Sequence, residues 1–135
     1  MDLQNLAYAL TQVGHNLGAV VVVAAPLHAL AARPSGARGV LWLALAGWAL
    51  QLGSGSLFGL VSYHFYGQLP DIHGIAIGAL ALKLACALAA VVLIGRALLR
   101  RRDVDGDQPG VGPWRVLTAL GVTALTAAAV LRWFS

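Results

Sequence analysis

Charged residues are scarce in this 135-residue chain. Asp, Glu, Lys and Arg together make up 10% of it, apolar residues make up 59%, and the mean hydropathy is +0.79. A soluble domain is typically about 25% charged and about 45–50% apolar. The composition therefore excludes an ordinary soluble domain and predicts one transmembrane domain over residues 1–135.

The chain also lacks the residue groups of several enzyme classes. Cys86 is the single cysteine, so there is no internal disulfide and no CxxC pair for redox or zinc chemistry. No Ser/His/Asp arrangement, paired carboxylates or phosphate-binding loop is present. Hydrolase and nucleotide chemistry are excluded on these grounds, and any catalytic role is at most electron transfer.

Four long apolar segments account for most of the chain. Lipid offers no partners to backbone N–H and C=O groups, so spanning segments are helices or strands of a closed barrel. These segments are continuous and rich in Ala and Leu, whereas a barrel strand would show about ten residues of alternation. The sequence predicts an all-α integral membrane protein, a four-helix transmembrane bundle. Its expected helices are residues 6–32, 40–61, 75–99 and 116–133, with a cytoplasmic loop over 100–115.

The arginines predict the orientation of this bundle. Seven lie at the first and third connections, none at the second, and one in a tail; the eight are Arg33, Arg38, Arg96, Arg100, Arg101, Arg102, Arg115 and Arg132. Cytoplasmic loops carry an excess of Lys and Arg. Both termini are therefore predicted on the outer, periplasmic side of a bacterial inner membrane. Basic residues confined to helix ends also argue against nucleic acid as a partner, despite a pI near 10.0.

Polar residues concentrate in the predicted outer half. With the loop arginines as the inner boundary, a rise of about 1.5 Å per residue puts Gln51 and Lys83 about 20 Å and His15 about 27 Å above it. No Asp or Glu lies in any apolar segment. A lysine at mid-membrane costs roughly 2.5–3.5 kcal/mol. Lys83 must therefore be neutral, hydrated, or bonded to Gln51, to backbone carbonyls or to an anionic ligand.

Two further features predict space and polarity between the helices. The GxxxG pairs Gly14–Gly18, Gly55–Gly59 and Gly74–Gly78 are typical of closely approaching helices, and could also leave room for a flat ligand. Thr123 and Thr126 continue the polar pattern in the last segment. Each of the four segments thus carries a stripe of polar side chains. Lipid does not solvate polar side chains, so all four polar stripes are expected to face inward.

The stretch "SYHFYGQLPDIHG", residues 62–74, connects the second and third segments. Its histidines, His64 and His73, come out about 35–39 Å above the inner boundary, in the headgroup zone. They could be interface anchors beside the aromatic residues of the stretch. Alternatively, they cap an outward cavity with His15, with Lys83 and Gln51 at its floor. Since neutral imidazole suits Fe, Cu and Zn, the three histidines are candidate ligands of haem iron or another metal.

These residues favour a small redox subunit of cytochrome b type. It would bind haem b or a quinone through His15, His64, His73, Lys83 and Gln51, within a larger respiratory complex. One alternative is an accessory or assembly subunit with no cofactor of its own. Another is a small homo-oligomeric transporter or channel, although the apolar inner half lacks polar residues that could line a continuous path across the membrane.

Overall fold

The computed structural model describes residues 3–34, 37–68, 70, 72–100 and 110–134. Over this part the chain is all-α. The helices are α1 (Leu3–Ala32), α2 (Ala37–Tyr66), α3 (Ile75–Leu99) and α4 (Val111–Phe134). Each of the four is long and apolar enough to cross a membrane. The predicted four-helix, multi-pass class is confirmed at this level.

Three of the four helices are longer than the apolar runs indicate: α1 begins at Leu3 rather than at 6, and α2 at Ala37 rather than at 40. α2 continues past residue 61 to Tyr66, and α4 begins at Val111 rather than at 116. His64 is therefore helical, and Trp114 and Arg115 belong to α4 rather than to a loop over 100–115, of which 101–109 lies outside the described residues. The physical reason is that hydrophobicity limits only the part of a helix inside the hydrocarbon. Backbone hydrogen bonding can continue into the headgroup region.

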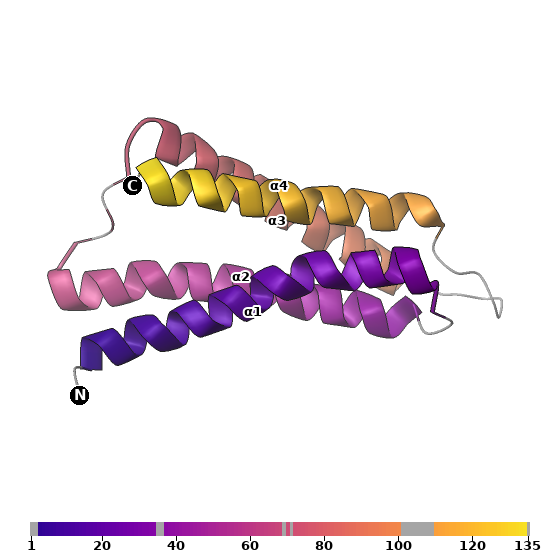
Figure 1. The fold of residues 1–135 in the computed structure, drawn as a ribbon, viewed down its shortest axis with the longest axis horizontal. Helices are drawn as coiled ribbons and strands as arrows, with labels where there is room; N and C mark the ends of the chain where they lie inside the picture. Colours follow the sequence, from indigo (N-terminus) through magenta and orange to yellow (C-terminus); the bar gives the residue numbers. More distant parts are fainter. Residues whose placement is uncertain (1–2, 35–36, 69, 71, 101–109, 135) are drawn as a thin grey trace.

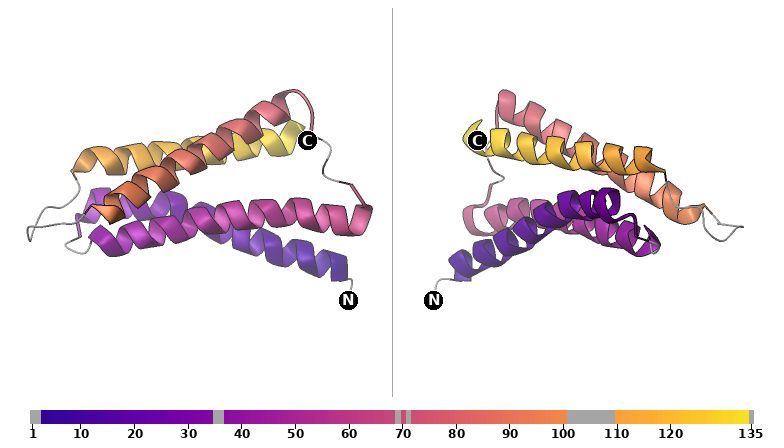
Figure 2. Two further views of the ribbon diagram at one scale, coloured as in Figure 1. Left: turned by 180° about the vertical axis from the view of Figure 1, so that it is seen from behind. Right: turned by 45° about the vertical axis from the view of Figure 1, so that its right-hand side comes forward.

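The helices form two antiparallel hairpins, α1–α2 and α3–α4 (Figure 1). Each helix contacts its neighbour in chain order, and α1 also contacts α4, so α1 lies diagonally opposite α3. Both chain termini and the α2–α3 connection lie at one end, here called the terminal end. The other two connections lie at the opposite, loop end. The hairpins are close at the loop end and diverge toward the terminal end, as Figures 1 and 2 both show.

Three glycines allow the close contacts of α1. A Cβ on Gly47 of α2 would lie 2.6 Å from Val21 Cγ1, and one on Gly121 of α4 would lie 2.9 Å from the Val22 carbonyl oxygen. A Cβ on Gly18 would lie 3.1 Å from the backbone of α2. Small residues let membrane helices approach in this way. Of the glycines in the GxxxG pairs, Gly18 is such a contact, but a Cβ at Gly55, Gly74 or Gly78 would meet nothing within 4 Å.

The apolar core is built mainly from small side chains around a few large ones. Its most buried large members are Trp48, Ile94 and Val22, and Cys86 is buried with them. Of the three buried polar residues among those described, Thr11 and Ser54 lie in the terminal halves of α1 and α2, and Gln51 lies at the midpoint of α2. The predicted division into an apolar loop half and a polar terminal half is therefore present in the packing.

The two tryptophans near the ends of α4 lie in different surroundings. Trp133 is 85% exposed, as an interface anchor would be, whereas Trp114 is 4% exposed and packs into the core. Trp114 lies on the face of α4 that also carries Leu117 and Gly121, three and four residues apart along the helix. That face meets α1, so the ring is enclosed by protein.

Candidate functional site

His15 is the centre of a hydrogen-bonded cluster that joins three helices. Its Nδ1 lies 2.8 Å from Ser54 Oγ of α2, and its Nε2 lies 3.1 Å from Lys83 Nζ of α3. Both contacts are partly buried. Because α1 and α3 are diagonal partners, the Lys83–His15 bond crosses the middle of the bundle.

The proton count of Ser54 fixes the tautomer of His15. Ser54 Oγ donates to the Leu50 carbonyl oxygen, which can only accept. A hydroxyl has one proton, so Ser54 Oγ must accept from His15 Nδ1–H. In a neutral imidazole Nε2 is then the acceptor, and the Lys83 amino group donates to it. The result is a directed chain from Lys83 through His15 and Ser54 to Leu50.

Lys83 reaches this chain by the length of its side chain. Counting helical rise places its backbone about 7 Å closer to the loop end than that of His15, and the flexible four-carbon stem spans such an offset. The expected partners were Gln51, carbonyls or an anionic ligand; the structure gives His15. An ammonium has three donors, and His15 is its one hydrogen-bond partner among the described residues. Two N–H groups therefore remain for water or a ligand.

Gln51 and Ser54 hold α2 against His15. Each is 4% exposed, and Gln51 Nε2 donates to the His15 carbonyl oxygen. Interhelical bonds of this kind contribute roughly 0.6 kcal/mol on average in membranes. Ser54 is not among the residues that the sequence predicts for the site. Its position three residues after Gln51, on the same face of the helix, was the available signal.

Aromatic rings flank the cluster on its terminal side. The Phe58 ring meets the His15 ring edge-on, with centroids 5.6 Å apart, and Tyr8 stacks on Phe58 at 6.4 Å. Farther toward the terminal end, Gln4 Nε2 donates to the Tyr66 hydroxyl. The seam between α1 and α2 is thus apolar and aromatic just beyond His15 and polar again near the helix ends.

The other two candidate histidines lie away from the cluster. Both are exposed; His64 packs its ring on Phe65 with centroids 4.9 Å apart, and the His73 carbonyl accepts the Ala76 N–H before α3. Within the described part of the chain, no hydrogen bond or ring contact joins either to His15. At roughly 100° per residue, His64 is turned about 80° from the Ser54 direction, whereas Phe65 continues the Ser54–Phe58 face.

The predicted metal centre is likewise not assembled by the described residues. The described residues bring together no group of three or more His, Cys, Asp or Glu side chains that could hold a metal ion. His15 is the one histidine of the cluster, and both of its ring nitrogens already have partners. The structure therefore joins His15, Lys83 and Gln51 of the predicted site and leaves His64 and His73 outside it.

The expectation that all four polar stripes face inward is wrong for α4. Thr123 and Thr126 are exposed, and Thr126 Oγ1 donates to the Val122 carbonyl of its own helix. A threonine can satisfy its hydroxyl in this way, so it need not leave the lipid-facing surface. On α1, Gln12 similarly donates to the exposed Asn16 at 2.8 Å.

The chemistry of the cluster is that of hydrogen-bond donors rather than free lone pairs. Lys83 offers two N–H groups, while the acceptor atoms of His15 and Ser54 are engaged. Comparison of the chain with protein-family models, with curated proteins and with solved structures finds no match at any of the three levels. The Lys83–His15–Ser54 cluster is therefore the main evidence for a function.

Proposed function

We propose that the chain is a membrane-embedded redox subunit that holds a quinone head group at Lys83, whose amino group His15 positions. The observation that carries this proposal is the Lys83–His15–Ser54 hydrogen-bond chain in the terminal half of the bundle. It presents unused N–H donors inside an otherwise apolar membrane domain. A quinone has the matching form, since it pairs carbonyl acceptors with an apolar ring and tail.

Quinone is preferred to haem b because of what the cluster offers. An axial ligand to haem iron must present a nitrogen lone pair, and the Nε2 lone pair of His15 accepts from Lys83. Haem binding would require that bond to break and a second ligand to approach. A quinone carbonyl requires donors, which Lys83 has in excess.

The cluster would also supply a proton to the bound ring. Reduction of a quinone to a quinol consumes two electrons and two protons. The electrons would come from a haem or iron–sulfur centre of another subunit in the complex. The Lys83 ammonium can give one proton to a reduced oxygen and become an amine, and water would supply the second. His15 stays neutral, and its Nε2 accepts from an N–H of Lys83 both before and after this transfer.

The test is quinone content after purification in mild detergent. We expect wild-type protein to retain quinone from the bacterial membrane and to take up added decylubiquinone. His15→Ala should weaken that uptake about tenfold or more, because it removes the acceptor that positions the ammonium. His28→Ala is the matched control, since His28 is exposed on the same helix near the loop end. It should leave uptake unchanged.

Each other outcome points to a different function. A Soret band that sharpens on reduction and disappears in His15→Ala would replace quinone by haem b. Neither ligand in wild-type protein would overturn the redox proposal in favour of an accessory or assembly subunit. Ion or solute flux through reconstituted protein, abolished by Lys83→Met, would favour a transporter.

A further inference from the structure

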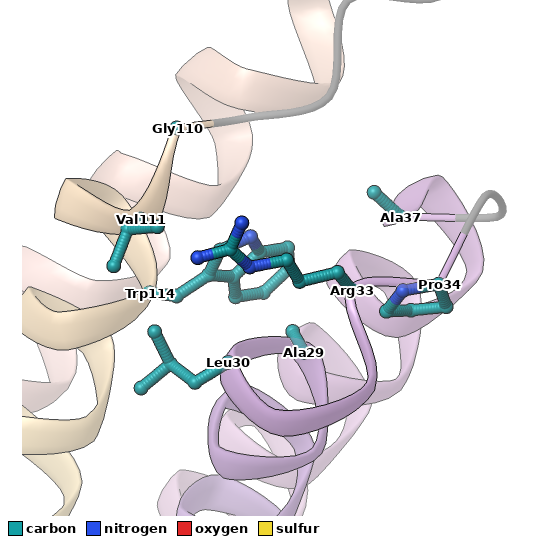
Figure 3. A pocket seen from close by; sticks show the side chains of 8 residues that line it. All are labelled: Ala29, Leu30, Arg33, Pro34, Ala37, Gly110, Val111 and Trp114. Carbon is teal, nitrogen blue, oxygen red and sulfur yellow. The ribbon is translucent and has the colours of Figure 1, made fainter.

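A second polar site lies at the loop end, far along the helices from His15. It is a pocket of about 200 Å³ between the end of α1, the start of α2 and the start of α4. A single water needs only about 10–15 Å³ measured with a water-sized probe. Eight residues line the pocket (Figure 3): Ala29, Leu30, Arg33, Pro34, Ala37, Gly110, Val111 and Trp114.

Arg33 brings a guanidinium into this pocket. α1 ends at Ala32, and the Arg33 N–H still bonds to the Ala29 carbonyl at 3.2 Å. Arg33 then adopts a left-handed φ of 42°, the conformation that commonly terminates a helix before proline. Its side chain extends from the end of α1 toward α4 and Trp114 (Figure 3). The five N–H donors of a guanidinium match the geometry of phosphate.

Trp114 also lines the pocket, and its indole N–H is a second donor there. The side chain is 4% exposed, and its indole N–H has no hydrogen-bond partner among the described residues. Buried indole N–H groups normally find a partner. No side-chain nitrogen or oxygen in the described chain is both sealed from solvent and unpaired. The Trp114 N–H must therefore reach accessible space, and the pocket is the space that this ring lines.

The start of α4 adds a third contribution. Gly110 and Val111 line the pocket directly before and at the first residue of this 24-residue helix. The first N–H groups of a helix have no partner within it, and the helix dipole there favours negative charge. A guanidinium, an indole N–H and a helix N-terminus converge on one volume, and all three favour an oxyanion.

We propose that this pocket binds the phosphate of an anionic phospholipid. Phosphate is the shared chemistry, and a lipid is the source because of the surroundings. The helix ends that frame the pocket continue into apolar membrane spans, and Ala29, Leu30 and Val111 form its apolar walls. A headgroup can place its phosphate against Arg33 and Trp114 while its acyl chains follow the helices. The site is independent of the quinone proposal.

Native mass spectrometry of the purified full chain tests this inference. Titration with phosphatidylglycerol should show one saturable lipid, and phosphatidylcholine should bind more weakly. Trp114→Phe, which keeps an aromatic ring and removes the indole N–H, and Arg33→Gln should each weaken that lipid about tenfold or more, by loss of a hydrogen bond to a charged group. Arg38→Gln is the control with the same change of charge, because Arg38 is exposed nearby and does not line the pocket.

Three results would overturn the proposal. Equal weakening by Arg33→Gln and Arg38→Gln would mean that lipid senses only the general charge of this end. Full competition by inorganic phosphate at the same concentration as the lipid would identify a free phosphate as the ligand. Unchanged affinity in both Arg33→Gln and Trp114→Phe would place the lipid elsewhere.

Discussion

At the level of single residues, Lys83 in a membrane-spanning helix is stabilised by a hydrogen bond to a histidine rather than by an ion pair with a carboxylate. Lys83 donates a hydrogen bond to His15 Nε2, and His15 Nδ1–H donates one to Ser54 Oγ. The Ser54 hydroxyl in turn donates to the Leu50 carbonyl oxygen. Each donor in this series has an acceptor that a membrane interior does not otherwise supply. The arrangement also leaves Lys83 with two unused N–H donors, so substitution of Lys83 is the most direct test of the proposed site.

Lys83→Met should separate ligand binding from stability. We expect quinone uptake to fall about tenfold or more, because a charged donor is lost. Membrane insertion should become easier by about 2.5–3.5 kcal/mol, since a buried charge is gone. The folded bundle should lose about 0.6–1.7 kcal/mol through the unpaired His15 nitrogen. Quinone titration measures the first effect, an insertion assay the second, and thermal unfolding in detergent the third.

Lys83→Arg serves as the matched control for this substitution. It keeps a positive charge and several N–H donors at the same position, so uptake should be partly retained. If Lys83→Met binds quinone as well as the wild type, the lysine is structural and the site lies elsewhere.

At the scale of helices, α1 is the element around which the others are placed. It packs on α2 through Gly18 and Gly47 and on α4 at Gly121, and it reaches α3 through Lys83. In lipid, helix association depends on close packing and polar contacts rather than on the hydrophobic effect. Substitution of a contact glycine should therefore act more strongly than substitution of an open one.

Gly121→Ala should destabilise the contact between the hairpins. The added Cβ would lie 2.9 Å from the Val22 carbonyl oxygen, which belongs to backbone and cannot move aside alone. Overpacking of this kind costs about 1–3 kcal/mol. Gly78→Ala is the control, since its Cβ would meet nothing within 4 Å. Thermal unfolding in detergent should show a lower transition for Gly121→Ala only; equal transitions would contradict this packing of α1 and α4.

At the scale of the whole molecule, the two hairpins converge at the loop end and diverge at the terminal end (Figure 1). The two sites proposed above lie in opposite halves of this shape. The apolar core and the Arg33–Trp114 pocket belong to the loop half, and the His15 cluster to the terminal half. Which end faces the cytoplasm is a prediction from the arginine distribution alone.

Cysteine labelling tests this orientation. In a Cys86→Ser background, a cysteine at Gln68, which is exposed at the terminal end, should react with an impermeant reagent from the periplasm. A cysteine at Gln108, in the third connection and outside the described residues, should react only after the membrane is opened. Reaction of both from one side would refute the four-span topology, and the reverse pattern would invert it.

The class of the molecule and the relative height of its polar groups along the helices could be predicted from the sequence. Long apolar runs separated by arginine-bearing connections leave few structures except a helical bundle in lipid. Helical rise then placed His15, Gln51 and Lys83 in the same half. These properties depend on position along one helix, which spacing in the sequence records directly.

Which of those residues meet could not be predicted from the sequence, because it depends on how the helices pack. Rotation and tilt of neighbouring helices are set by packing, here by Gly18, Gly47 and Gly121, whose contacts on other helices do not appear in local spacing. That rotation brings Lys83 to His15 and directs His64 away from it. It also encloses Trp114, although tryptophan is a residue type enriched at the membrane interface. Depth is a property of one helix, whereas a site depends on the angles between several.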